Sequence, residues 1–521
     1  MELSPLVEGR FFRAQLRLRE TLTKTPGFLR HRHDLVYWAI PCLVAALTYQ
    51  LSERRIAEVI GLAIGLAVLA IFSSRPAAAL LTLVGFLPLQ APIFGLLLGF
   101  HVPASLLRNC SALKELLALS LLIAALGEIR ATNQRLDLLD KAILIYLAVT
   151  VAYLSVPHLF APGSPLAWAP RINAWRVDSV YMIVFFSVRH CTFTERVRTR
   201  FTQVVFSIGM LTAGFGLYQA VSPSGFQHLL LNRLRQVDYL YLVVKEPASE
   251  IEQALHWVVN PHPLHVSSIF TSSPYDMADY MVLVAGLAIA RITANRRSPW
   301  NYVVLAGAVA MIFLSRVRAD GLAVLIVVGL ALIPAPRQVL EGRIRLMLGV
   351  VLAAAILVPS LGGTTFLGGE GARQTNYGHV KELRLGVDLI GQHPLGLGLG
   401  EQAVNATRYQ SQLAVPSGVL QASGSVVQVG DELGLQALLP WIVIVGAVFG
   451  RLWRSRRSDP FVEGATLALV GILVAGEFHH VFVTYPLAWT LWAAIGLALP
   501  NNHTVQDTPS TDRPRIATLT A

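Results

Sequence analysis

The chain has 521 residues, of which 54% are hydrophobic and only 14% are charged. Soluble domains carry about 25% charged residues, so this composition indicates a protein that a lipid bilayer solvates. The net charge of +11 would suit a nucleic-acid-binding protein, but the basic residues gather between apolar segments, which indicates membrane topology instead.

Apolar stretches that are long enough to cross a membrane recur along the chain, because a span needs roughly 20 predominantly apolar residues. The sequence therefore predicts an all-α polytopic transmembrane helical bundle of about 12–14 spans. These stretches start near Leu35, Ile56, Pro76, Ala112, Leu139, Asp178, Val204, Met277, Tyr302, Gly321, Arg345, Leu435, Gly464 and Val481. Because Pro88 and Pro92 interrupt the third stretch, we expect its second half to be re-entrant.

The segments around these stretches define the expected organisation. Residues 1–34 form a basic lead, residues 35–499 the transmembrane domain, and residues 500–521 a polar tail that we expect to be disordered. With a cytoplasmic N-terminus, most basic residues fall in inside loops, as the positive-inside rule requires. We therefore expect a multi-pass protein of the cell (inner) membrane with both termini cytoplasmic. Its two longest loops, about 222–275 and 361–434, are then extracytoplasmic.

Common cofactor and nucleotide motifs are absent from the sequence. The three cysteines, Cys42, Cys110 and Cys191, are too few and too scattered for a disulfide framework or a metal site. No Walker A, His-Glu-x-x-His or Cys-x-x-Cys pattern occurs. We expect no cofactor, and an ATP-driven pump is disfavoured.

Two arginines stand at an expected outer boundary, within Ser315-Arg316-Val317-Arg318. Such residues can simply extend their charged ends into the interface. Because the positive-inside rule disfavours them on this side, we favour a function for Arg316 and Arg318 in binding phosphate through the guanidinium fork.

An amphipathic helix is predicted at 379–392 in the second outer loop. Its apolar residues recur at three- and four-residue steps: Val380, Leu383, Val387 and Ile390. Its opposite face carries Lys381, Arg384 and Asp388, and Pro394 ends it. Two interpretations remain open, a helix lying in the interface and a cationic ledge over a lipid-linked anion.

A glycine-rich run follows this helix, in which Gly396, Gly398 and Gly400 alternate with leucines. Such glycines allow close approach of a backbone to phosphate oxygens, although the run taken alone favours a tight turn. A dinucleotide site is excluded, because no strand precedes the run.

Carboxylates and histidines at the outer ends of spans are candidates for acid–base chemistry. Asp431 and Glu432 can serve as a base, pair with an arginine, or merely face water. Glu477, His479 and His480 lie between the last two spans, where we expect a structural role. His379 has the better surroundings for catalysis, because it precedes Lys381 and Arg384.

Several of these segments together resemble the signature region of the O-antigen ligase and Wzy-type O-antigen polymerase superfamily. The resemblance is carried by the stretch from Gly378-His379 to the glycine run, by 427–435 (Val-Gln-Val-Gly-Asp-Glu-Leu-Gly-Leu), by Ser315-Arg316, and more weakly by 269–275. It covers roughly residues 265–500. The front half of the chain matches only in hydropathy.

Members of that family are multi-span, GT-C-like glycosyltransferases, and they act without metal or nucleotide. They move glycan from an undecaprenyl-pyrophosphate carrier to a glycan or lipid acceptor on the extracytoplasmic face. The resemblance implies that Arg316 and Arg384 hold the pyrophosphate and that His379 assists the transfer. Where many members have His-Asn, this chain has Ser423-Gly424, which leaves the identity of the base open.

We therefore expect a membrane glycosyltransferase of this type. Its expected catalytic residues are His379 and Glu432, and its expected pyrophosphate-binding residues are Arg316, Arg318, Lys381, Arg384, Gly396, Gly398 and Gly400. Expected partners are the bilayer, the lipid-linked oligosaccharide, an acceptor, and polysaccharide export or assembly proteins. The alternatives are a secondary transporter or flippase, and a non-catalytic scaffold for envelope assembly.

Overall fold

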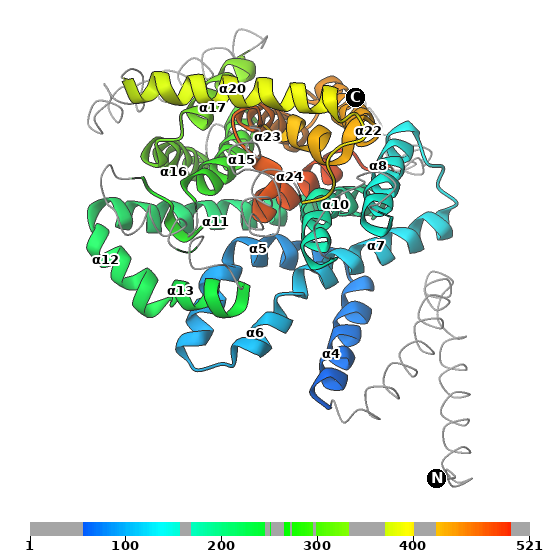
Figure 1. Cartoon of the computed structure of the whole chain (residues 1–521), viewed down its shortest axis with the longest axis horizontal. Coiled ribbons are helices and arrows are strands. Elements are labelled where there is room, and N and C mark those ends of the chain that lie inside the picture. Colours follow the sequence, from blue (N-terminus) through cyan, green and yellow to red (C-terminus); the bar gives the residue numbers. More distant parts are fainter. Residues whose placement is uncertain are drawn as a thin grey trace, which may run out of the picture.

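The computed structural model describes residues 56–156, 168–244, 251, 265–270, 273–294, 298–332, 370–400 and 424–501. Within these ranges the fold is all-α and contains no strand. The main helices are α4 (Ile56–Ser73), α5 (Pro76–Gly99), α6 (Ala104–Cys110), α7 (Leu113–Thr132), α8 (Leu138–Ser155), α10 (Trp168–His190), α11 (Glu195–Val221), α15 (Pro274–Ala294), α16 (Pro299–Ser315), α17 (Arg318–Leu332), α20 (Glu370–Gln392), α22 (Ser425–Ser455), α23 (Pro460–Gly476) and α24 (Tyr485–Ala498) (Figure 1). Some predicted segments lie outside the described residues. They are the spans expected near Leu35 and Arg345, the lead at 1–34, and residues 502–521 of the tail.

Six helical segments in the described part are long and apolar enough to cross a membrane. They are Pro76–Gly99, Ala104–Thr132, Leu138–Ser155, Glu195–Val221, Pro274–Ala294 and Ser425–Ser455. Shorter apolar helices pack among them, including α16, α23 and α24. The prediction of a helical membrane protein is confirmed at this level.

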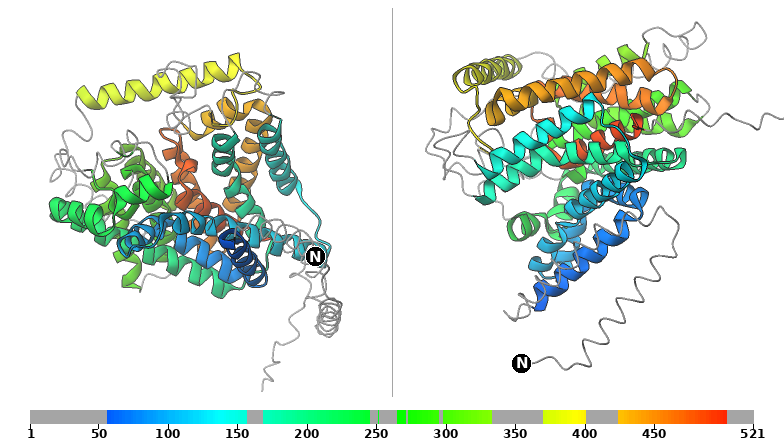
Figure 2. Two further views of the ribbon diagram at one scale, coloured as in Figure 1. Left: turned by 60° about the horizontal axis from the view of Figure 1, so that its bottom comes forward. Right: turned by 90° about the vertical axis from the view of Figure 1, so that its right-hand side faces the viewer.

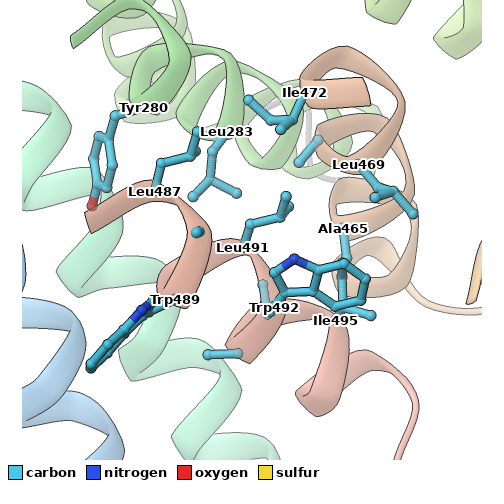
Figure 3. Packing of buried hydrophobic residues seen from close by; sticks show 14 of the residues in the cluster. Tyr280, Leu283, Ala465, Leu469, Ile472, Leu487, Trp489, Leu491, Trp492 and Ile495 are labelled. Carbon is cyan, nitrogen blue, oxygen red and sulfur yellow. The ribbon is translucent and has the colours of Figure 1, made fainter. Parts of the chain in front are cut away.

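The core of the bundle is built around α15, which packs against α16, α17 and α23. A Cβ on Gly286 of α15 would lie 2.8 Å from the backbone nitrogen of Ala468 in α23, so the two backbones meet closely only because this residue is glycine. Figure 3 shows Leu487, Leu491 and Trp492 of α24 packed among side chains of α15 and α23. Helices from the last third of the chain therefore complete the core.

A polar network ties several helices together at one end of the bundle, here named the Asp137 end. Asp137 is the N-cap of α8 and accepts hydrogen bonds from Nη2 of Arg189 (2.6 Å) and Nη1 of Arg451 (2.7 Å). Asp140, in the same capping box, accepts from Arg189 and from Asn501 Nδ2 (3.1 Å). These contacts place the start of α8 beside the ends of α10, α22 and α24.

Several boundaries differ from the sequence prediction, among them the start of α20, which begins at Glu370 and not at 379. Helix α5 runs unbroken through Pro88 and Pro92, so the prediction of a re-entrant second half is wrong. Each proline removes one backbone hydrogen bond, and the helix continues past both of them. Helix α10 begins at Trp168, which places Asp178 inside the helix and not at its start. Helix α22 already begins at Ser425 and contains a kink at Gly434.

Short helices fill the described part of the first long loop. They are α12 (Pro223–His228), η1 (Leu229–Arg233), α13 (Gln236–Asp238), η2 (Tyr239–Val244) and the 3-10 turn η3 (Ser268–Phe270). Phe226, Leu230 and Tyr239 from this region form a separate small core with Phe94 and Leu98 of α5. In the second loop, α20 lies across one edge of the molecule and contacts α22 (Figures 1 and 2). The end of α20 at Gln392 confirms the predicted stop before Pro394.

Candidate functional site

The α16–α17 junction holds both arginines of the Ser-Arg motif. Ser315 Oγ donates to the Ile312 carbonyl (2.6 Å) and accepts from the Val317 amide (3.2 Å), which fixes a tight turn. Arg316 occupies the left-handed region (φ 60°) as the C-cap of α16, a conformation that is uncommon outside glycine. Arg316 and Arg318 are both half-buried at this turn.

The segment before α15 packs against this junction. The Val266 amide donates to the Leu314 carbonyl (3.1 Å), and the Gln219 side chain accepts from the amides of Ser267 (3.0 Å) and Ser268 (2.9 Å). The buried side chain of Gln219 thus provides the hydrogen bonds that these two backbone amides, which lie outside a helix, would otherwise lack. The start of α15 is thereby placed beside the arginines.

Two buried carboxylates and a histidine meet at the same end of the bundle, here named the Asp279 end. Asp279 (α15) is 1% exposed and Asp320 (α17) is 0% exposed. Nε2 of His479, in the α23–η5 turn, lies 2.9 Å from Oδ1 of Asp279. One ligand atom from each of the three residues lies within 4.8 Å of the other two. We name these three residues the Asp–Asp–His cluster.

The surroundings of His479 connect this cluster to the arginines. Its ring lies 5.3 Å from that of Tyr275, whose hydroxyl is close enough to Arg318 and Asp320 to interact electrostatically with both. Burial lowers the pKa of His479, and the negative charges of Asp320 and Asp276 oppose that effect. The imidazole therefore favours its neutral form, in which one ring nitrogen can bind a proton or a cation.

A second group of cations lies at the beginning of α24. Lys114 is 6% exposed, donates to Gln90 Oε1 (3.2 Å), and places its Nζ 5.2 Å from the Tyr485 ring centroid. Arg176 lies 5.9 Å from the same ring and forms an ion pair with Glu115. Two cations and one carboxylate leave this group with a net positive charge, which favours anion binding.

The first turn of α15 and the residue before α24 link the two cation groups. Thr484 Oγ1 donates to Asp276 Oδ1 (2.6 Å), and Tyr485 follows directly in the chain. The Asp279 end thus carries both the arginine pair and the Lys114–Arg176 group.

The predicted glycine run packs against the kink in α22. Gly396, Gly398 and Gly400 all have positive φ (80°, 117° and 86°). The Leu397 amide donates to the Asp431 carbonyl (2.7 Å) and the Gly398 amide to the Glu432 carbonyl (3.0 Å). These carbonyls precede the break at Gly434, where the helix supplies no amide to bond them. The amides of the glycine run take that place. The amides of Leu397 and Gly398 are therefore engaged with α22.

Glu432 belongs to a separate polar group in the bundle interior. It is 1% exposed, and one of its carboxylate oxygens, Oε2, accepts from the Gly400 amide at 3.4 Å. Its carboxyl group also interacts with that of Asp178, whose backbone carbonyl accepts from the Tyr146 hydroxyl (2.9 Å). A hydrogen bond between two carboxyl groups requires that one of them carries a proton.

The remaining predicted residues lie on α20. Lys381 and Arg384 are exposed, and so are the apolar residues Val380, Leu383 and Val387. Ile390 packs at Gly430 of α22. His379 is a residue of α20, but its side chain lies outside the described part of the structure. Helix α20 therefore offers both cations and an apolar stripe to its surroundings, as a helix in a membrane interface does.

No protein-family model matches the chain, and no curated protein matches it either. The start of α22 lies at the same end of the bundle as the start of α15 and the arginine turn, and the glycine run contacts α22 at Asp431 and Glu432. Gly424 precedes α22, and Ser425 Oγ donates to the His479 carbonyl (3.5 Å). Sequence reasoning missed the grouping of Asp279 and Asp320 with His479, for which it expected a structural role. The only signal in the sequence was the position of each acidic residue near the start of an apolar helix, Asp279 in α15 and Asp320 in α17.

Proposed function

We propose that this protein is a membrane glycosyltransferase of the O-antigen ligase or polymerase type, with a GT-C-like architecture. It transfers or polymerises glycan from an undecaprenyl-pyrophosphate-linked donor. The observation that carries this proposal is the gathering of two half-buried arginines and a second, net positive group at one end of an apolar bundle. A lipid-linked pyrophosphate requires this combination, an apolar surround for the carrier and cations for its head group.

The proposal assigns roles to the residues at this end. Arg316 and Arg318 bind the pyrophosphate, and Lys381 and Arg384 of α20 add positive charge at the rim. His379 takes the proton of the acceptor hydroxyl, because an imidazole has a pKa near neutrality. Glu432 and the glycine run hold the kinked start of α22 in place beside them. Pyrophosphate is a good leaving group, so positioning and charge neutralisation supply the catalysis.

The proposal also assigns an orientation. The Asp137 end carries basic residues on several helices, among them Arg189, Arg198 and Arg451. The positive-inside rule places such an end in the cytoplasm. The Asp279 end then faces the extracytoplasmic side, where a flipped lipid-linked oligosaccharide is available.

The test is an assay of the purified protein in lipid nanodiscs with a lipid-linked oligosaccharide extract and no nucleotide. Release of free undecaprenyl pyrophosphate with a ladder of longer glycans identifies a polymerase, and release with transfer to another acceptor identifies a ligase. Arg316→Ala should abolish release and leave the protein folded. Failure of the wild type to release carrier, with donor shown to be present, contradicts the proposal.

A secondary transporter is the second candidate, and one observation favours it. Asp178 and Glu432 are buried in the bundle interior, where ionisable residues often mark ion pathways. Uptake of a proton with a lipid-linked glycan or a small solute would use such a pair. Proteoliposomes that move glycan-lipid between leaflets without releasing carrier would favour this candidate. A protein that shows neither activity fits the scaffold alternative.

A further inference from the structure

The Lys114–Arg176 group contains a lysine that the fold buries. Lys114, in the first turn of α7, is 6% exposed, and the one hydrogen bond of its ammonium group among the described residues goes to the neutral side chain of Gln90 (3.2 Å). Glu115 is the one described carboxylate that acts on it electrostatically, and this carboxylate already forms an ion pair with Arg176. A buried cation is costly unless an anion is paired with it. The described side chains therefore leave Lys114 short of negative charge.

The Arg176–Glu115 ion pair gives a second, independent indication that a ligand belongs here. The pair forms between Nη2 of Arg176 and Oε1 of Glu115. Nε of Arg176 and Oε2 of Glu115 are both buried, and neither has a hydrogen-bond partner among the described residues. Buried polar atoms nearly always have a partner. Because one of these atoms is a donor and the other an acceptor, a ligand that completes the pair needs both an acceptor and a donor.

The position of the group separates it from the arginine turn. The contact between Thr484 and Asp276 places Tyr485 near the start of α15, but Lys114 and Arg176 belong to α7 and α10. Helix α10 packs against α24, whereas α16 and α17 pack against α15. Figures 1 and 2 show α16 and α10 on opposite sides of α24. A ligand of the Lys114–Arg176 group is therefore distinct from an anion at the arginine turn.

The charge and the atom types define the kind of ligand. Two cations and one carboxylate carry a net charge of +1, which one carboxylate of a ligand balances. We propose that the Lys114–Arg176 group binds an acidic sugar of the uronic-acid kind. The sugar carboxylate accepts hydrogen bonds from Lys114 and from Nε of Arg176, and a sugar hydroxyl donates to Oε2 of Glu115. The side chains of Arg176 and Glu115 are 29% and 27% exposed, so the sugar reaches them from outside the core.

This site also specifies the substrate class of the proposed transferase. A sugar bound at the Asp279 end, apart from the pyrophosphate, belongs to the glycan that is transferred or to its acceptor. The glycan or acceptor of this protein therefore contains an acidic sugar. This last statement rests on the proposed function, whereas binding of a free acidic sugar rests on the Lys114–Arg176 group alone.

The experiment uses the full chain in nanodiscs of phosphatidylcholine, titrated with glucuronate at constant ionic strength. Saturation-transfer NMR of the ligand measures the Kd, and glucose and inorganic phosphate are tested in the same way. We expect glucuronate to bind saturably, and glucose and phosphate to bind at least about tenfold more weakly, because each lacks part of the required chemistry. Phosphate that binds as tightly as glucuronate overturns the sugar assignment.

Matched variants locate the binding site. Lys114→Met and Arg176→Gln should each weaken glucuronate binding by at least about tenfold, because each removes a charge-assisted contact. Arg454→Gln, at the Asp137 end, and Arg316→Ala, at the arginine turn, should bind glucuronate as the wild type does. Equal binding by the wild type, Lys114→Met and Arg176→Gln overturns the proposal, and so does the absence of binding by the wild type.

The controls separate loss of a contact from loss of the fold. Each variant is compared with the wild type by gel filtration and by its ligand-free Tm. If Lys114→Met fails to fold, Arg176→Gln decides. Glucuronate should raise the Tm of the wild type and leave that of Arg176→Gln unchanged. Because no lipid-linked donor is present, carrier release without glucuronate binding rejects only the acidic sugar, and glucuronate binding without carrier release rejects only the transferase.

Discussion

Nη1 of Arg451 lies 2.7 Å from Oδ2 of Asp137, and the two residues are 314 positions apart in the chain. Asp137 also caps α8 and accepts a hydrogen bond from Arg189, so one carboxylate joins three helices at one end of the bundle. Helix α22 is the helix whose other end carries Glu432 and the glycine-run contact. The Asp137 network therefore fixes, from the opposite end, a helix that shapes the candidate site.

Removal of this carboxylate should measurably destabilise the protein. Asp137→Ala removes the N-cap and the acceptor of hydrogen bonds from two arginines, at a cost of about 2 kcal/mol. Thermal unfolding in detergent, followed by circular dichroism, measures the effect as a lower Tm. The matched control is Glu195→Ala, which removes an exposed pairing with Arg198 and should change the free energy of unfolding by less than about 0.5 kcal/mol. Equal Tm values for both variants would show that the network does not hold the helices together.

The same carboxylate predicts an acid-dependent loss of stability. Burial alone would raise the pKa of Asp137, but the hydrogen bonds from Arg451 and from the Asp140 amide, with the charge of Arg189, lower it below its usual value. Because the folded pKa lies below the unfolded value of about 3.9, the ionised carboxylate stabilises the fold at neutral pH. This contribution is lost as the pH falls through the folded pKa.

Comparison with Asp137→Asn isolates this effect. The Tm difference between wild type and variant should be constant from neutral pH down to about pH 5 and should shrink below about pH 4. The asparagine retains the capping geometry, so the titrating charge is the main change. A Tm difference that does not vary with pH would contradict the assigned ion pairs.

The kink in α22 should depend on a single glycine. Gly434 has φ 69° and ψ −175°, and a Cβ there would lie 2.5 Å from the carbonyl carbon of Leu395. Gly434→Ala should therefore destabilise the protein by about 2 kcal/mol or more, because this backbone conformation belongs almost only to glycine. Gly446→Ala, in the same helix with no atom within 4 Å of its Cβ, should be neutral or stabilising. The Tm values of the two variants and the wild type are measured side by side. If Gly434→Ala has the Tm of the wild type, the fold does not require glycine at the kink.

The fold class and the end of α20 were predictable because they depend on local patterns. Apolar stretches of sufficient length predict spans, and the spacing of Val380, Leu383 and Val387 predicts an amphipathic helix that stops before Pro394. The start of α10 was predicted wrongly, because a polar residue such as Asp178 usually marks the end of an apolar span. Asp178 instead lies inside the helix, where its partner is the buried Glu432, and the sequence does not show this pairing. The residue pattern of one sequence does not show which polar side chains pair with each other inside the bundle.

The candidate site was predicted only in part, for a related reason. Arg316 and Arg318 were recognised because basic residues at that boundary conflict with the positive-inside rule. Asp279 and His479 are 200 positions apart, and only the packing of α23 against α15 brings them together. The intact helix through Pro88 and Pro92 was missed as well, since neighbouring helices support a proline-containing span in a way that local propensity does not describe.

The binding of undecaprenyl pyrophosphate tests the central proposal most directly, because it requires no acceptor. We would measure its affinity for the protein in nanodiscs and compare Arg316→Ala and Arg318→Ala with Arg454→Ala, which removes an exposed arginine from the Asp137 end. Loss of a charge-assisted contact of about 1.5–3 kcal/mol should weaken binding by roughly tenfold to a hundredfold in the first two variants. The third should bind as the wild type does. Equal affinity in all four proteins would contradict the assignment of the pyrophosphate to the Asp279 end.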